Sequence, residues 1–165
     1  MLIPASGQGY DCGMRELPAE IGSYLSSHSV MTLATQGADG PWAAAVFYAL
    51  DAGSLIFLSS PTTRHALDLE QDDRCAATIQ DDTADWKTVK GIQLEGRVER
   101  LAGDDAARAR DSYAERFPLI SPLAKIPPAI ADALARIAWY RLVPTRMYFI
   151  DNARGFGHRE AVDLG

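Results

Sequence analysis

Cysteine is scarce in this chain, which has two cysteines among 165 residues. Two cysteines cannot supply the disulfide framework of a small secreted domain. Cys75 lies in an apolar run with Ala76, Ala77 and Ile79, and is expected to be a buried, reduced thiol. Cys12 lies in a glycine-rich start, and no base is placed beside it that would make it a nucleophile.

Long apolar runs and an excess of positive charge are also missing. No run approaches the roughly 20 residues that span a bilayer, and Met1–Gly9 lacks the basic start and apolar stretch of a secretory signal. A cytoplasmic protein is therefore expected. The net charge of −6 disfavours nucleic acid and anionic membranes as partners. An anionic ligand would need a local positive site.

The motifs of several common enzyme classes are absent. There is no Gly-x-Gly-x-x-Gly fingerprint after a strand and no Walker sequence. His28, His65 and His158 are far apart and lack ligand-spaced partners, so no metal site is expected. Neither paired carboxylates placed for hydrolysis nor a nucleophile elbow is present. No catalytic acid or base can be named.

The chain length suits one domain with its own core, expected over residues 17–165 after a flexible N-terminal arm of residues 1–16. Apolar periodicity predicts helices at residues 17–27, 61–71, 104–117 and near 130–137. It predicts strands at residues 30–35, 43–50, 55–59, 74–80, 92–101 and 138–150, the last interrupted at Pro144. Turns are expected at residues 36–41 and 51–54. Strands arranged in hairpins favour a mainly β fold, an antiparallel barrel with peripheral helices.

The densest polar chemistry follows the strand at residues 55–59. Ser59, Ser60, Thr62 and Thr63 supply hydroxyls, Arg64 supplies a cation, and a helix beginning at Pro61 would add free N–H groups. Together these groups would form an anion pocket of the kind that phosphates occupy. His65 would add a donor, and a bound dianion would raise its pKa. The competing interpretation is an ordinary capped helix with its arginine in solvent.

The run Thr63-Arg64-His65-Ala66 resembles the phosphate-binding segment of the pyridoxamine 5′-phosphate oxidase-like split barrels, which bind flavin mononucleotide (FMN). The segments His28–Leu33, Arg146–Asn152 and Gly155–His158 are similar to those of small bacterial members rather than of the oxidase itself. The resemblance implies an antiparallel split β-barrel and an FMN-binding oxidoreductase. It also implies a homodimer with FMN at the subunit interface and an unknown small-molecule substrate.

The resemblance also implies cofactor-binding roles for particular residues. Arg64 would contact the phosphate, Ser59 would lie near the phosphate and ribityl chain, and His65 stands where the oxidase pattern has lysine. The strand backbone from Ala43 to Tyr48 would lie against the flavin ring, approached by Lys90 and Gly91 from another strand, and Arg159 would reach the cofactor or substrate. The full implied set is Ala43, Val46, Phe47, Tyr48, Leu58, Ser59, Ser60, Thr63, Arg64, His65, Lys90, Gly91 and Arg159.

Physical chemistry adds two further expectations and leaves alternatives open. Trp42, Phe47 and Tyr48 suit a flat ring, although core packing is the favoured explanation of each of them taken singly. Lys87 or Lys90 near the ring would stabilise its reduced form. The alternatives are a non-catalytic flavin carrier or sensor, a deazaflavin-binding protein, and a haem-binding relative with His158 as ligand.

Overall fold

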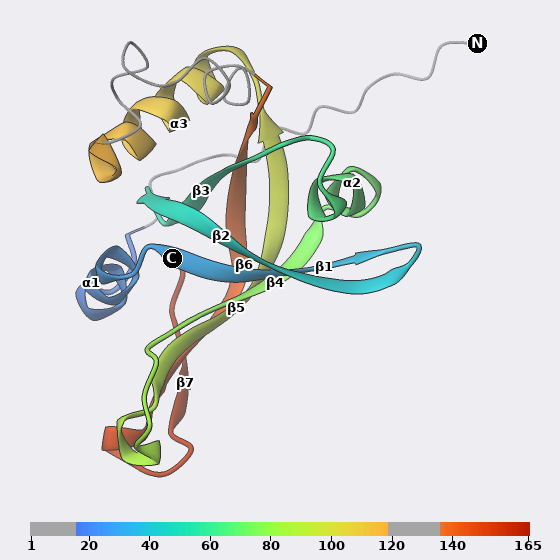
Figure 1. Ribbon diagram of the computed structural model, residues 1–165. Helices are drawn as coiled ribbons and strands as arrows, with labels where there is room; N and C mark the ends of the chain where they lie inside the picture. Colours follow the sequence, from blue (N-terminus) through green and yellow to red (C-terminus); the bar gives the residue numbers. More distant parts are fainter. Residues whose placement is uncertain (1–15, 119–135) are drawn as a thin grey trace.

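A computed structural model of the protein describes residues 16–118 and 136–165. Seven strands form one antiparallel sheet in the order β3-β2-β1-β4-β5-β6-β7, and β3 also pairs with β6. The second pairing closes the sheet into a barrel, with three helices of the described residues around it (Figure 1). The predicted antiparallel split barrel is therefore confirmed.

The elements follow the predicted order along the chain. The strands are β1 (Val30–Gly37), β2 (Gly40–Asp51), β3 (Ser54–Ser59), β4 (Arg74–Gln80), β5 (Lys90–Leu101), β6 (Ala138–Asp151) and β7 (Arg159–Ala161). The helices are α1 (Ala19–Ser27), α2 (Arg64–Gln71) and α3 (Gly103–Arg116), with short 3₁₀ turns η1 (Trp86–Thr88) and η4 (Asn152–Arg154). None of the described helices is long and apolar enough to cross a membrane.

Two tight hairpins set the register of the first three strands. Asp51 pairs with Ser54, and the two residues between them, Ala52 and Gly53, have φ values of 45° and 78°. This positive-φ pair matches the right-handed twist of the strands, which confirms the predicted turn. The turn between β1 and β2 is shorter than expected, because Gln36 and Pro41 are already paired across the hairpin.

Alternate residues of the strands fill the barrel. Fully buried side chains include Leu25, Met31, Leu33, Tyr48, Leu55, Phe57, Ile79, Ile92, Leu142 and Phe149. Each contributes about 1.5–3 kcal/mol of hydrophobic stabilisation relative to an exposed position. The Tyr48 hydroxyl donates to the Leu25 carbonyl at 2.6 Å, which ties the end of α1 to the core. A second cluster forms where α3 covers Ala49 and Ile56 with Tyr113.

Several predicted boundaries are corrected by the structure. Helix α2 begins at Arg64 rather than Pro61, because the Thr63 N–H bonds the Ser60 carbonyl in a preceding turn. Strand β5 begins at Lys90, two residues earlier than expected. The C-terminal tail contains β7, which pairs with β6. The N-terminal arm, except residue 16, and almost all of the helix expected near residues 130–137 lie outside the described residues.

Strand β6 continues through Pro144 rather than stopping there. The register with β5 shifts between Glu95 and Gly96, so that Gly96 lies opposite Pro144 while Glu95 lies opposite Arg146. This β-bulge leaves Thr145 as the extra residue and accommodates the missing proline N–H. A Cβ atom on Gly96 would lie 2.4 Å from the Val143 carbonyl oxygen, so the bulge requires glycine.

Replacing Gly96 with alanine is expected to lower the free energy of unfolding by about 1–3 kcal/mol, because the new methyl group meets backbone that cannot move aside. Urea unfolding measures this change. Gly22→Ala is the matched control, since nothing lies within 4 Å of a Cβ at Gly22 in α1. That variant is expected to gain about 0.5–1 kcal/mol. Unchanged stability in Gly96→Ala would contradict the bulge.

Candidate functional site

The residues after β3 form a compact polar cluster, which we call the junction cluster: Ser59, Thr63 and His65. Ser59 Oγ lies 2.7 Å from His65 Nε2 and 3.0 Å from Thr63 Oγ1, and Thr63 Oγ1 lies 3.1 Å from the same nitrogen. Ser59 and His65 are each 8% exposed. The structure therefore brings together three of the polar groups that the sequence predicts at this position.

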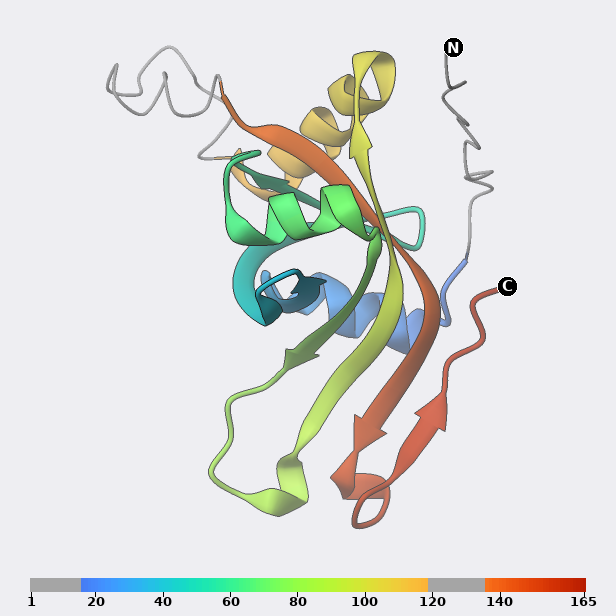
Figure 2. The same ribbon diagram turned by 90° about the vertical axis from the view of Figure 1, so that its right-hand side faces the viewer.

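The local fold explains why these three side chains meet. Ser59 ends β3, and the turn from Ser60 to Thr63 reverses the chain into α2. The Thr63 hydroxyl donates to the Ser60 carbonyl at 2.9 Å, which fixes its orientation. In the same turn, Ser60 Oγ and Thr62 Oγ1 lie 2.9 Å apart and are exposed. Figure 2 shows α2 at the near side of the barrel in that view.

Burial lowers the pKa of His65 below its usual value, and the nearby Asp68 carboxylate opposes this effect more weakly. Asp68 is itself buried and accepts a hydrogen bond from the Thr35 hydroxyl at 2.8 Å. A Cβ on Gly37 would fall 1.9 Å from Asp68 Oδ1, so the glycine makes room for the carboxylate. Sequence reasoning missed this support. The three-residue spacing of His65 and Asp68 on one helix could have predicted that their side chains are neighbours. Nothing in the sequence pattern pointed to the contacts of Thr35 and Gly37 with Asp68.

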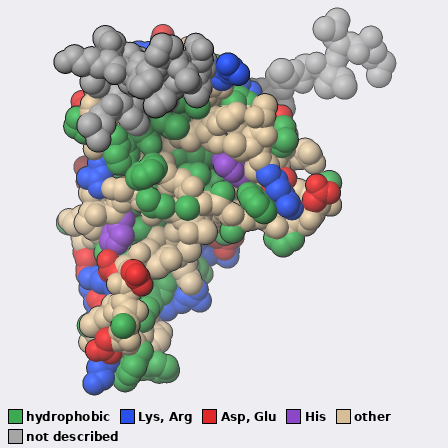
Figure 3. Space-filling model, in the orientation of Figure 1, with side chains coloured by type: hydrophobic (Ala, Val, Ile, Leu, Met, Phe, Trp, Pro, Cys, Tyr) green, Lys and Arg blue, Asp and Glu red, His purple; other side chains and the backbone are tan. Residues whose placement is uncertain are grey.

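Arg64 projects away from the junction cluster toward the β1–β2 hairpin. Its Nη2 donates to the carbonyl oxygens of Asp39 at 3.2 Å and Gly40 at 3.3 Å. Its guanidinium carbon lies 4.7 Å from the centre of the Trp42 ring. The Arg64 Nε is buried and has no hydrogen-bond partner among the described residues. Figure 3 shows charged side chains of both signs near the end of this hairpin.

Strand β2 has one open edge beside the junction. Strand β3 pairs with β2 only from Tyr48 to Asp51, while β1 pairs with Gly40 to Phe47. The Tyr48 N–H donates to the Ser29 carbonyl oxygen on the β1 side. Because successive residues of a strand direct their backbone N–H and C=O groups to opposite edges, those of Ala43, Ala45 and Phe47 are directed to the edge away from β1. In the part of the chain that the structure describes, no strand pairs with that edge.

The side chains of the β2 segment differ in their surroundings. Val46 and Tyr48 are buried in the core. For Tyr48 this agrees with core packing rather than with contact to a flat ring. Phe47 is 57% exposed and its ring lies edge-on to Phe117 at 5.7 Å. Trp42 is 42% exposed. Leu58, on the neighbouring β3, packs against the second hydrophobic cluster under α3.

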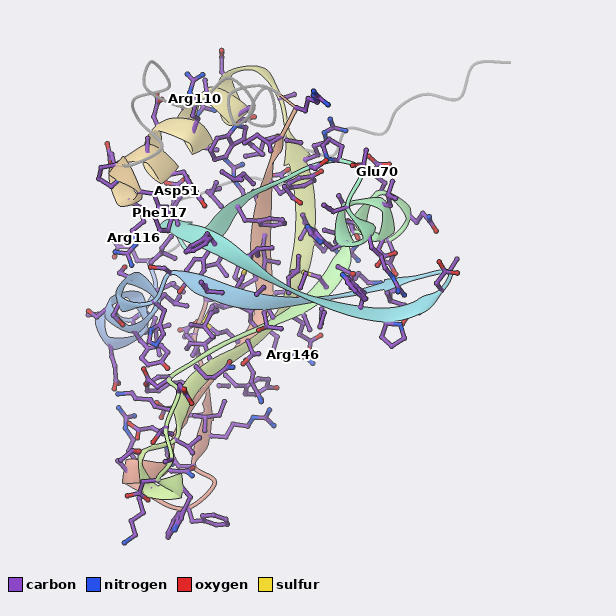
Figure 4. All side chains as sticks on the ribbon, viewed as in Figure 1. Asp51, Glu70, Arg110, Arg116, Phe117 and Arg146 are labelled. Carbon is purple, nitrogen blue, oxygen red and sulfur yellow. The ribbon has the colours of Figure 1, made fainter. Side chains whose placement is uncertain are left out.

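Lys90, Gly91 and Arg159 lie apart from the junction cluster within one chain. Lys90 Nζ lies 3.6 Å from Asp151, and Gly91 pairs with Ile150 and Gln80 in the sheet. Arg159 stacks over Tyr148 at 4.8 Å and donates to Gln93. It lines a hollow of about 540 Å³ on the outer surface of the sheet, whose lining includes residues of β1, β4, β5 and β6. Arg146 of β6, labelled in Figure 4, lies 2.7 Å from a carboxylate oxygen of Glu95 on β5.

Two other predicted residues lie in distinct environments. Lys87 Nζ lies 5.6 Å from the Trp86 ring centre in η1, at the end of the long extension that the β4–β5 and β6–β7 connections form (Figure 1). His158 Nε2 is buried without a hydrogen-bond partner in the described chain, 3.6 Å from a Glu160 carboxylate oxygen. Cys75 is a buried free thiol, which confirms the prediction of a buried, reduced cysteine. Its burial raises the pKa of the thiol to about 12.

Comparison with known proteins gives matches over most of the chain. The family described as pyridoxamine 5′-phosphate oxidase matches residues 17–151. A UPF0306 protein of Klebsiella pneumoniae is 32% identical over 143 residues, 86% of this chain and 89% of the relative.

Solved structures share the fold. A heme binding protein from Mycobacterium smegmatis has a TM-score of 0.68 at 24% identity, covering 86% of this chain and 55% of that protein. This chain thus spans about half the length of that protein. A FAD-binding protein from Mesorhizobium loti has a TM-score of 0.62 at 17% identity, covering 79% of this chain and 92% of that protein. At such identities the likeness concerns the fold alone.

Proposed function

Because this chain belongs to the pyridoxamine 5′-phosphate oxidase family, we propose that it binds FMN at the β3–α2 junction and acts as an FMN-dependent oxidoreductase. The observation that carries the proposal is the junction cluster together with the next residue of α2, Arg64, whose Nη2 is held by the β1–β2 hairpin and whose buried Nε–H lacks an acceptor among the described residues. A phosphate group would supply that acceptor. The N–H groups of the first turn of α2 and the hydroxyl of Ser59 would donate to the same group, while the Thr63 hydroxyl keeps its hydrogen bond to the Ser60 carbonyl.

The open edge of β2 supports the same placement. Ala43, Ala45 and Phe47 offer backbone donors and acceptors in a row, which suits the hydrogen-bonding edge of a flavin ring. The methyl side chains of Ala43, Ala44 and Ala45 leave room for a flat ring to approach the strand. The exposed ring of Phe47 adds an apolar contact.

The division of labour follows from this arrangement. A bound flavin supplies hydride or electron transfer through its ring, while the protein supplies binding, orientation and electrostatics. The junction holds the phosphate and thereby fixes where the ring lies along β2. No side chain at the junction is assigned as an acid or base, so the substrate is proposed only as a small molecule.

We further propose a homodimer with FMN at the subunit interface. In one chain, Lys90, Gly91 and Arg159 line hollows that do not include the junction cluster. A single FMN site that combines these three residues with the junction cluster would therefore take them from a second copy of the chain. The hollow that Arg159 lines is open on the outer surface of the sheet, and its small side chains Ala34 and Ala76 allow close approach. Light scattering of the protein with and without FMN measures the assembly.

Titration with FMN tests the proposal. Oxidised flavin that binds the protein keeps its two absorption bands in the blue and near ultraviolet and stays with the protein on gel filtration. Riboflavin, which lacks the phosphate, is expected to bind more weakly by about 1.5–3 kcal/mol. Equal binding of the two would contradict the phosphate site, and absence of FMN binding would contradict the function. A parallel titration with a deazaflavin tests that alternative.

Haem binding is the second candidate, and His158 is the observation that favours it. The Nε2 of His158 has no hydrogen-bond partner among the described residues and lies 3.6 Å from a Glu160 carboxylate oxygen, so its lone pair is not used in a hydrogen bond. The Mycobacterium smegmatis protein with this fold is a heme binding protein. Added haem would then give a Soret band that is lost in His158→Ala. His28→Ala is the control, because His28 is bonded to Asp81 and Tyr24. A spectrum identical in wild type and His158→Ala would reject His158 as the ligand.

A further inference from the structure

We propose that the phosphate group of FMN is bound together with one proton taken up by His65, so that the affinity for FMN falls as the pH rises. This inference rests on the proposed FMN site. It concerns His65, the residue that stands where the oxidase pattern resembled by this segment has a lysine. A lysine keeps its charge near neutral pH, whereas a histidine gains or loses it there.

The hydrogen bonds of the junction cluster are closed on themselves without a ligand. The single hydrogen of Thr63 Oγ1 is used on the Ser60 carbonyl, at 2.9 Å. The Ser59 hydroxyl lies 2.7 Å from His65 Nε2, a distance at which an uncharged imidazole nitrogen accepts the serine hydrogen. A neutral His65 therefore satisfies the cluster when no anion is bound.

A phosphate dianion changes that balance, because its oxygens only accept hydrogen bonds. The Ser59 hydroxyl can donate to phosphate only when it is released from His65 Nε2, which happens when that nitrogen carries a hydrogen. The neutral ring could place its one hydrogen there, but beside a dianion the charged imidazolium, which has taken up a proton, is the favoured form. The protonated ring then has a donor near Ser59 and Thr63, where the phosphate would lie. An anion within about 4–6 Å also favours the charged imidazolium directly.

The surroundings of His65 set the sign of the effect. Burial disfavours the charged ring in the free protein, and its pKa is lowered. Asp68, one turn along α2, is the charged group whose field opposes this, and it is held by Thr35 of β1. Ser59 of β3 and Thr63 of the turn face His65 with uncharged hydroxyls, and the Arg64 head is directed to the β1–β2 hairpin.

The pH dependence follows from linkage. Below the pKa of free His65 both states are protonated, so affinity does not change with pH through this residue. Between that pKa and the raised pKa of the bound state, binding takes up a proton, and affinity falls by up to tenfold per pH unit. Above the bound-state pKa the affinity is low and constant. Because the second pKa of a phosphate monoester is about 6, FMN itself stays a dianion above about pH 7.

The experiment measures the dissociation constant of FMN at several values from about pH 7 to about pH 9. Calorimetry in two buffers of different ionisation enthalpy counts the protons taken up. For the wild type we expect the dissociation constant to rise with pH and proton uptake near pH 7. Riboflavin binding is expected to show neither effect, since it lacks the phosphate.

Two substitutions of His65 test whether this residue is the source of the pH dependence. His65→Lys is expected to bind FMN with little pH dependence, and His65→Gln to bind more weakly at about pH 7 and also without pH dependence. If wild-type protein binds FMN with the same affinity throughout and takes up no proton, the inference about His65 is overturned while FMN binding stands. If no FMN binds at any pH, both fall. Proton uptake by the wild type keeps the test decisive even if a variant fails to fold.

Discussion

Replacing Arg64 with alanine is expected to weaken FMN binding by about 10- to 150-fold. This range corresponds to about 1.5–3 kcal/mol for the loss of a hydrogen bond to a charged group. The guanidinium Nε–H of Arg64 is buried without a partner and lies at the start of α2, where the phosphate is proposed to bind. Flavin fluorescence quenching during titration measures the dissociation constant.

Controls separate binding from folding in that experiment. Arg64 also holds the carbonyls of Asp39 and Gly40, so urea unfolding of the variant is measured beside its affinity. Arg110→Ala removes an exposed arginine of α3 and is expected to leave FMN affinity unchanged. Figure 4 shows Arg110 over α3, well apart from Glu70 over α2. Wild-type affinity in Arg64→Ala would reject the phosphate assignment.

Replacing Phe57 with alanine is expected to reduce the free energy of unfolding by about 3–5 kcal/mol. Phe57 is fully buried in β3, and its ring stacks on Tyr140 of β6 with centroids 5.1 Å apart. These two residues are paired in the register that closes the barrel. The alanine would leave a cavity at that closure, where two strands must keep their register.

Phe156→Ala serves as the matched control for Phe57→Ala. Phe156 is 84% exposed, so the same chemical change is expected to alter stability by less than about 0.5 kcal/mol. Denaturant unfolding followed by circular dichroism measures both variants. Similar stabilities for the two would show that Phe57 does not carry the packing described for it.

The fold was predictable because local signals and global topology agree. The Ala52-Gly53 turn, the alternation along β5 and the apolar runs of β3 and β4 each specify an element without tertiary information. The start of α2 was not predictable from the preference of Pro61 for a first helical turn. The Ser60–Thr63 turn there depends on hydrogen bonds that a sequence pattern does not show. Strand β7, of three residues, is too short for periodicity to reveal.

The candidate site was predictable in position but not in orientation. The sequence places Ser59, Thr63, Arg64 and His65 at one junction, and the structure gathers three of them. Consecutive helical residues point about 100° apart, since a turn takes 3.6 residues. His65 therefore faces the barrel while Arg64 faces the β1–β2 hairpin. Thr35 and Gly37, which support Asp68 beneath His65, come from another strand, and their role depends on the closed sheet.

The pairing of β3 with β6 has a consequence for the order of events during synthesis. Strand β3 leaves the ribosome early, whereas its partner is the last long strand in the sequence. The nascent chain can form its first two hairpins, yet it cannot close the barrel through the β3–β6 pairing until residues 138–142 have emerged. Contacts so distant along the chain make folding slow compared with local structure. Closure of the barrel by the β3–β6 pairing is therefore expected to be a late step in refolding. The stacked pair Phe57 and Tyr140 lies at that closure, so its formation reports on this step.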